Sequence, residues 1–283
     1  MTPPATSLTG AARSSLTALQ SRWLGSIHLH MLSSPLRKCI VTSKVLPTSL
    51  MLQLKPVRLA PTLSTSASDK YSSAGLSSKA SQPSGAAERI VVLPNAILHP
   101  KYSPRKTGTG TWITLDARVF AHLRQKASYK RVDSKAVLAA QIEDLVWWQL
   151  GERCIQELHE LVDRFGTSRR LDLFARPDDD TLLQPRRWQI RLQTQTKDVR
   201  VESHVFQPSF QDAHQSQRFQ QAIQDLLAPT PEMHELACVY TVKHSHITAP
   251  LGIALYRLNL WVSNAAPPMP RTPQLKQPKS ELS

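Results

Sequence analysis

The first 68 residues of the chain contain no aspartate or glutamate, and the first acidic residue is Asp69. Seven basic residues are spread through this stretch among many serines, threonines, leucines and alanines: Arg13, Arg22, Arg37, Lys38, Lys44, Lys55 and Arg58. A basic, hydroxyl-rich segment without acids is typical of an organelle transit peptide, which a negative-inside membrane potential draws inward. We therefore predict that residues 1–68 are a transit peptide.

The arginine content and amphipathic clusters such as Leu50 to Leu59 favour the mitochondrion over the plastid as the destination. The predicted location is the mitochondrial matrix or the matrix face of the inner membrane. The sequence from Met31 onward also reads as the start of a transit peptide, so translation from Met31 is an alternative to one long leader.

Long hydrophobic runs are lacking throughout the chain. A secretory signal needs an unbroken apolar run of about 7–15 residues, and a transmembrane helix needs about 20 mostly apolar residues. Lys135 to Trp148 comes closest to such a span, but Gln141, Glu143 and Asp144 interrupt it. We therefore expect no secretory signal and no transmembrane segment.

Cysteines are few, and no spacing between Cys39, Cys154 and Cys238 is typical of a metal site or a disulfide framework. We expect buried, reduced thiols. His244 and His246 share one face of a predicted strand, but no further ligand lies at a diagnostic spacing, so a solvent-facing strand end is favoured over a metal site.

Motifs for nucleophile elbows, zinc proteases, phosphate loops and dinucleotide binding are also absent from the sequence. The sequence therefore predicts no catalytic residue, no cofactor and no metal, and favours a protein that is not an enzyme. An enzyme whose site joins residues distant in sequence, such as Glu202, His204 and His244, stays as a third alternative.

Beyond the leader, low-complexity segments flank one region with regular patterns. Residues 69–89 are rich in serine and alanine and predict a disordered linker, because they offer little apolar surface to bury. Residues 266–283 predict a proline-rich unstructured tail. Residues 90–265 then form a single domain of ordinary size.

Periodicity within residues 90–265 predicts an α+β fold. We expect a mostly antiparallel sheet packed on one face by two or three helices, in the approximate order α-α-β-β-β-α-β-β. The predicted helices cover residues 116–126, 133–165 and 216–227, and the predicted strands cover residues 90–98, 171–175, 188–194, 199–205, 236–246 and 252–262. Gly151 predicts a kink or a close helix contact near Trp147 and Trp148.

Charge is unevenly distributed over this domain. The whole chain carries a formal net charge of +14. Between Lys101 and Arg131 there are eight basic residues and one acid, Asp116, whereas between Val132 and Tyr240 there are seventeen acids and twelve bases. The predicted domain is thus mildly acidic with one basic segment.

This basic segment is the predicted binding surface. Lysines and arginines interleaved with aromatic side chains are typical of surfaces that hold single-stranded RNA. The predicted binding residues are Lys101, Arg105, Lys106, Trp112, Arg124, Lys126, Lys130 and Arg131, joined by Arg187 and Arg191 on the outward face of one strand. We expect a non-enzymatic mitochondrial accessory protein associated with RNA or ribosome-containing assemblies.

An anionic lipid surface or an acidic protein partner is attracted by the same charges. The alternative is therefore a protein-binding assembly or organelle-maintenance factor peripheral to the inner membrane. The Trp147 and Trp148 region would then contact the partner.

Overall fold

Residues 26–59 belong to the folded structure. The computed structural model describes residues 26–59, 89–103, 108–164, 174–175, 187–192, 205–227 and 239–265. The first of these ranges holds α2 (Ile27–Leu32), β1 (Leu36–Lys38), β2 (Val45–Pro47), the 3-10 turn η1 (Thr48–Leu50) and β3 (Met51–Leu59). The fold therefore starts well before residue 90, where the sequence predicted the domain to begin. The predicted linker 69–89, apart from Arg89, and the predicted tail lie outside the described residues.

The strand β3 is an inner strand of a four-stranded sheet of order β5-β3-β4-β6. Its partners are β4 (Arg89–Asn95) and β5 (Thr111–Thr114), both antiparallel, while β6 (Val137–Leu138) joins β4 in parallel. Leu52 and Leu54 alternate with Gln53 and are fully buried, which is the period-two pattern of a strand. The same alternation explains why this part of the predicted leader is folded.

Pro94 lies within β4 and does not end the strand. Proline has no backbone N–H to donate to a neighbouring strand. It is therefore tolerated in a strand where no neighbouring strand pairs with it on that side. On the far side of β4 from β3, β6 pairs only with Val91 and Val92 and stops short of Pro94. The strand consequently continues to Asn95.

A second four-stranded sheet has the order β7-β10-β8-β9. It contains β7 (Phe174–Ala175), β8 (Arg187–Arg191), β9 (Val205–Phe206) and β10 (Val239–Lys243). Trp188, Ile190 and Leu192 are buried, as the predicted alternation requires. The strand β9 pairs with β8 in parallel, whereas the sequence predicted a mostly antiparallel sheet. The α+β class is thus confirmed, but the strands form two mixed sheets and a small β1–β2 hairpin.

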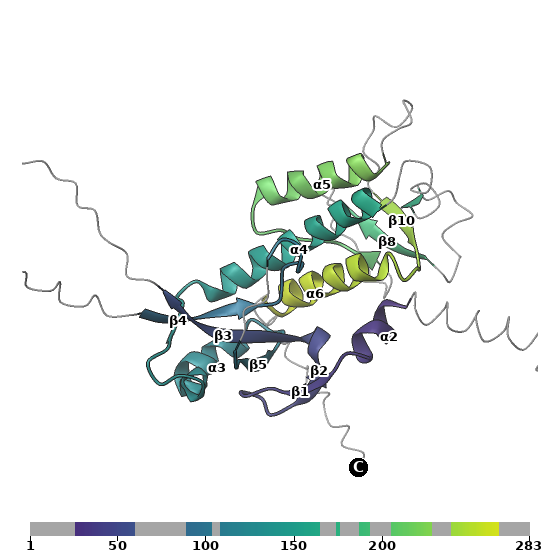
Figure 1. Cartoon of the computed structure of the whole chain (residues 1–283). Coiled ribbons are helices and arrows are strands. Elements are labelled where there is room, and N and C mark those ends of the chain that lie inside the picture. The colour runs from purple at the N-terminus through teal and green to yellow at the C-terminus, as the bar shows by residue number, and fades with distance from the viewer. Residues whose placement is uncertain are drawn as a thin grey trace, which may run out of the picture.

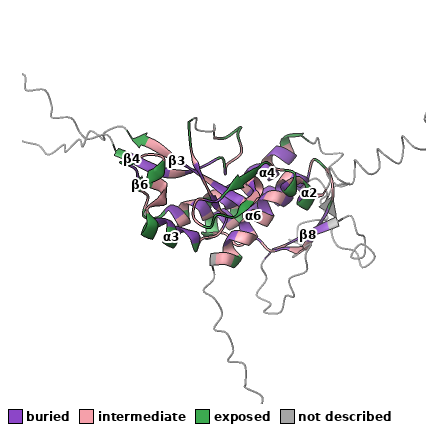
Figure 2. Cartoon of the chain, turned by 90° about the horizontal axis from the view of Figure 1, so that it is seen from below, coloured by how far each residue is buried: buried purple, intermediate pink, exposed green. Residues whose placement is uncertain are grey.

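In the described part of the chain, four helices of eight residues or more pack among these sheets: α3 (Val119–Lys126), α4 (Ile142–Arg164), α5 (Ala213–Leu227) and α6 (Ala249–Ala265). The central one is α4, which contacts both α5 and α6 (Figure 1). Buried side chains concentrate along α4 and α6 (Figure 2). The short 3-10 turn η2 (Ser128–Arg131) follows α3 directly.

The helix α6 corrects the predicted strand over residues 252–262. Pro250 sits in the first turn of this helix, where a missing N–H is tolerated. Leu251, Leu255 and Leu258 lie 3 or 4 residues apart and are completely buried. Because none of residues 249–262 is exposed, the segment is apolar on nearly all sides and its helical period is hidden in the sequence. The element order of the prediction is wrong at this point.

The helix α4 starts at Ile142, later than the predicted start near Asp133. Ahead of it, Val137 and Leu138 extend the first sheet as β6, and this pairing takes the place of the first predicted turns. The end at Arg164 agrees with the prediction within one residue.

Two glycines let helices approach closely. A Cβ at Gly151 of α4 would lie 2.4 Å from the buried side-chain oxygen of Gln215 on α5, which confirms the predicted close helix contact. A Cβ at Gly252 of α6 would lie 2.3 Å from Cδ1 of Ile27 on α2. The second contact ties the N-terminal segment to the core.

The Gly252–Ile27 contact gives a first prediction. We expect Gly252→Ala to lower the free energy of unfolding by about 1–2 kcal/mol, because overpacking outweighs the better helix propensity of alanine. Ile27→Ala alone should cost about 2–5 kcal/mol through its cavity. Urea unfolding should show that the double variant loses less free energy of unfolding than the sum of the losses in the two single variants, since the cavity left by Ile27→Ala accepts the methyl group of Gly252→Ala. Strictly additive losses would contradict the contact, and Ser134→Ala on the surface is the control.

Candidate nucleic-acid interface and an arginine-lined cavity

Two of the predicted binding residues are paired with carboxylates. Lys101 Nζ lies 2.7 Å from Glu160 and 2.8 Å from Asp163, both on α4. Arg124 on α3 donates from both Nη atoms to the carboxylate of Glu143 at the start of α4. These ion pairs fix the basic segment against α4, and they leave both cations less available to an anionic partner.

Three further predicted residues form an exposed basic cluster. Lys126 is the last residue of α3, and Lys130 and Arg131 lie on η2. Ala127 between them adopts the left-handed conformation (φ 48°), which ends α3 and turns the chain into η2. None of the three cations has an ion pair or a side-chain hydrogen bond with another described residue, and all are exposed. Lys135, also exposed, follows four residues later. We call Lys126, Lys130, Arg131 and Lys135 the basic cluster.

The predicted strand face of β8 is less open than the sequence indicates. Gln189 pairs across the sheet with Thr241, so the two side chains share one face, and Thr241 is only 1% exposed. Arg191 on that face is half-buried, and its Nε is enclosed without a hydrogen-bond partner among the described residues. Arg187 lies on the same strand, whereas Arg105 and Lys106 lie outside the described residues.

Trp112 lines a cavity of about 490 Å³ between the first sheet and α6, and no residue of the basic cluster is among its lining residues. Gln53 on β3 is opposite both Trp112 on β5 and Asn95 on β4, so these three side chains form one row across the sheet. Asn95 Nδ2 donates to Gln53 Oε1 at 2.7 Å. The opposite wall is one face of α6, made by Pro250, Ile253, Ala254 and Arg257. Thr48 and Ser49 of η1 line one end, and Ala96 and Ile97 line another.

Arg257 is the unusual member of this cavity. Its Nη2 donates to the carbonyl of Met51 at 3.2 Å, and its Nε is buried without a partner in the described part of the chain. Arg153 of α4 also lines the cavity and pairs with Glu157 at 2.6 Å, but Arg257 has no carboxylate partner among the described residues. Burial, followed by the neighbouring charge of Arg153, lowers the pKa of Arg257 to about 10. The group is still a cation at neutral pH, so the cavity carries positive charge that no carboxylate of the described residues compensates.

Sequence reasoning did not identify Arg257. A signal was present, because Arg257 is the only charged residue in the apolar run from Ala249 to Val262. Charged residues are rarely buried unless they are paired, so a single arginine in such a run marks a position of interest. Arg153 gave no comparable signal, because it lies among the other charges of α4.

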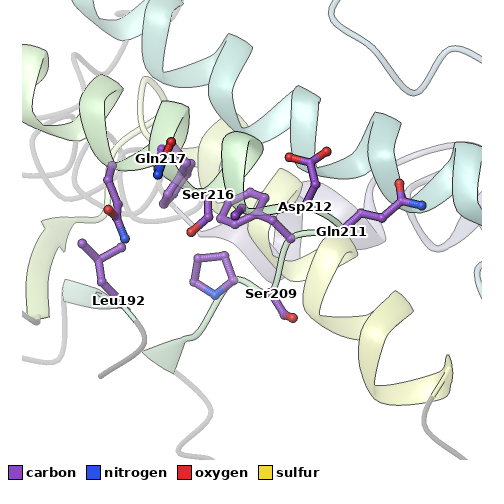
Figure 3. Close-up of a pocket in the computed structure, with 11 residues that line it drawn as sticks. Leu192, Ser209, Gln211, Asp212, Ser216 and Gln217 are labelled. Atoms are coloured by element: carbon purple, nitrogen blue, oxygen red, sulfur yellow. The ribbon is translucent and has the colours of Figure 1, made fainter. Parts of the chain in front are cut away.

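A second cavity, of about 410 Å³, lies at the start of α5 (Figure 3). Leu192, Ser209, Gln211, Asp212, Ser216 and Gln217 are among its lining residues. Asp212 is engaged in the local structure, since its Oδ1 accepts from the backbone N–H of Gln215 at 2.6 Å. No lysine, arginine or histidine lines this cavity within the described residues, so they offer an anion no cationic side chain there.

An exposed apolar patch lies on α2 and the β1–β2 hairpin. Leu29, Leu32, Leu36 and Val45 are between 42% and 61% exposed. Three exposed cations accompany them on the hairpin and its turn: Arg37, Lys38 and Lys44. We call this set of seven residues the hairpin patch. Trp148 is a further exposed aromatic at 38%, whereas Trp147 donates from Nε1 to the carbonyl of Ser209 at 3.0 Å.

Other candidate chemistry finds little support in the described residues. They contain no group of three or more histidine, cysteine, aspartate or glutamate side chains that could hold a metal ion. His244 and His246 lie after the end of β10 at Lys243, although the predicted strand over residues 236–246 included both. Cys154 is a buried free thiol, as predicted, and Cys39, in the predicted leader, is buried and free as well. No described helix is both long enough and apolar enough to cross a membrane.

Comparison of the chain with protein-family models, with curated proteins and with solved structures finds no match.

The Lys101 ion pairs give a prediction about pH. Lys101 lowers the pKa of both Glu160 and Asp163 through hydrogen bonding. These two carboxylates therefore bind protons more readily in the unfolded chain than in the folded protein. The stabilisation is therefore present above about pH 5 and is lost as the pH falls through the lowered pKa values. We expect Lys101→Met to destabilise the protein at pH 7 and to differ little from the natural protein near pH 3.

Urea unfolding between pH 3 and pH 8 measures this difference. Lys126→Met is the matched control, because Lys126 has no carboxylate partner among the described residues and should show no such trend. A destabilisation by Lys101→Met that stays constant down to pH 3 would assign the effect to packing of the side-chain stem near Tyr102, not to the ion pairs.

Proposed function

We propose that the protein is a non-enzymatic mitochondrial accessory protein that associates with RNA or ribosome-containing assemblies through the basic cluster. The supporting observation is that Lys126, Lys130 and Arg131 are exposed and have no carboxylate partner among the described residues. Cations that are not already paired can displace the counterions of a phosphate backbone. Lys101 and Arg124, which form ion pairs, contribute mainly to stability in this proposal.

A test compares two triple variants that remove the same charge. The first variant combines Lys126→Ala, Lys130→Ala and Arg131→Ala. It should bind single-stranded RNA more weakly, and the slope of the logarithm of the binding constant against the logarithm of the salt concentration should become less steep by about 2. Arg37→Ala, Lys38→Ala and Lys44→Ala together remove three exposed cations elsewhere and should leave RNA binding nearly unchanged. Equal losses in both variants would show that only net charge matters. Fluorescence anisotropy at several salt concentrations measures both quantities.

The hairpin patch favours a second candidate function, a factor peripheral to the inner membrane. Exposed apolar side chains next to lysine and arginine are the combination that binds anionic lipid surfaces. Four of the eight exposed large hydrophobic side chains among the described residues belong to this patch.

The same two triple variants separate the candidates. Co-sedimentation with vesicles of anionic lipid measures the difference. Binding should be lost in the variant that replaces Arg37, Lys38 and Lys44, and also in a variant that combines Leu32→Ser with Leu36→Ser. The Lys126, Lys130 and Arg131 variant should keep it. Vesicle binding without RNA binding would replace the first proposal by the second.

The fold also restricts which part of the chain import can remove. Loss of residues 1–68 would delete β3, whose two neighbours β4 and β5 pair with it directly. A start at Met31 would delete Ile27, which is 2% exposed and packs at Gly252. We therefore propose that any removed segment ends before Ser26.

Mass spectrometry of the protein purified from mitochondria tests this limit. The expected mature N-terminus lies at or before Ser26. An N-terminus after Leu59 would contradict the described fold of the mature protein, and absence of the protein from mitochondria would contradict the predicted location.

A further inference from the structure

The cavity between the first sheet and α6 contains a cation for which the described residues provide no counterion. Burying an unpaired charge is unfavourable unless a partner compensates it. Arg257 makes one hydrogen bond, to the Met51 carbonyl, and its buried Nε makes none with a described residue. The carboxylate of Glu157 is already engaged by Arg153, which lines the same cavity. An anionic group from a ligand would supply the missing partner.

The rest of the lining selects among anions. Trp112 provides an aromatic side chain at the sheet wall, and the Gln53–Asn95 amide pair lies beside it. An aromatic face accepts a stacked planar ring, and side-chain amides hydrogen-bond the edge of a nucleobase. Thr48 and Ser49 place hydroxyl groups at one end of the cavity. A volume of about 490 Å³ is in the usual range for small-molecule sites.

A strained backbone position borders the cavity. Ala96, directly after β4, has φ 58°, in the left-handed region that residues other than glycine rarely occupy. Such strain is found preferentially at ligand sites, where the surrounding structure holds it. Together with the unpaired arginine and the polar row, it distinguishes this cavity from an ordinary packing defect.

We propose that this cavity binds one nucleotide, with its phosphate on Arg257 and Arg153 and its base against the row formed by Trp112, Gln53 and Asn95. The ligand is either a free nucleoside monophosphate or a terminal nucleotide of a single-stranded RNA, since both present the same phosphate and base. The basic cluster is a separate surface, so this site does not depend on the proposed RNA surface.

Isothermal titration calorimetry with the full chain tests the site. The probes are the four ribonucleoside 5′-monophosphates, adenosine and inorganic phosphate. We expect at least one monophosphate to bind, and to bind at least about tenfold more tightly than adenosine or phosphate, since each of these has only one of the two recognised groups. Equal affinity for phosphate would overturn the nucleotide assignment, and so would no detectable binding of any monophosphate.

Substitutions on α6 locate the binding. Arg257→Met should lower the affinity for the monophosphate by at least about tenfold, because a charge-assisted hydrogen bond to the phosphate is lost. Ile253→Glu keeps Arg257 but places a carboxylate four residues before it, on the same helix face, where it competes with the ligand phosphate. Ile253→Gln is the control of the same size without the charge, and the Glu variant should bind at least about tenfold more weakly than the Gln variant. Equal affinities for the Glu and Gln variants would overturn the site, provided that both retain the thermal transition of the natural protein.

Two further arms separate the ligand sources and the two proposals. A 5′-phosphorylated single-stranded oligonucleotide that competes with the bound monophosphate would identify an RNA end as a ligand, and no competition would identify a free nucleotide. The Lys126, Lys130 and Arg131 variant should keep full monophosphate binding. If it does while the natural protein fails to bind RNA, the proposed RNA surface is wrong and the nucleotide site stands. If RNA binds but monophosphates do not, the reverse holds.

Discussion

Burial of α6 is the constraint on which the rest of the described structure depends. An apolar helix without an exposed residue from Ala249 to Val262 needs cover on every side. The helix α4, the turn η1 and the strand β3 contact α6, and Ile27 of α2 packs at Gly252. The ring of Phe120 on α3 packs edge-on against Trp261, with 6.0 Å between the ring centroids. Because α2 and β3 supply part of this cover, the segment from Ser26 to Leu59 cannot be separated from the core without exposing α6.

Pairing decides which of the many cations of this chain can meet a partner. The formal charge of +14 gives no information on this point. Lys101 and Arg124 form ion pairs to α4, and Arg218 of α5 holds Glu152 of α4 through two hydrogen bonds of 2.7 and 2.9 Å. The basic cluster and the three cations of the hairpin patch remain exposed, and Arg257 lines a cavity without a carboxylate partner among the described residues. These places, not the whole basic segment, are where anion recognition has a structural basis.

Parts of this arrangement could be predicted from the sequence, and the failures have physical reasons. The alternation of Trp188, Ile190 and Leu192 and the close approach at Gly151 depend on local patterns, and both predictions are confirmed. In α6 the helical period is hidden because both faces are apolar. In β3 the alternation of Leu52 and Leu54 with Gln53 was present, but the acid-free composition favoured a leader. The ion pairs of Lys101 and Arg124 join residues 62 and 19 positions apart, which no local pattern reveals.

Hydrogen exchange of the backbone amides of β3 tests most directly whether the N-terminal segment is part of the core. In the full-length protein, mass spectrometry should find the amides from Leu52 to Val57 protected to a similar degree as those of β4, because the two strands pair from Gln53 to Leu59. Exchange in β3 as fast as in an unstructured peptide, with α6 still protected, would contradict the account, since α6 would then be covered without the segment assigned to cover it.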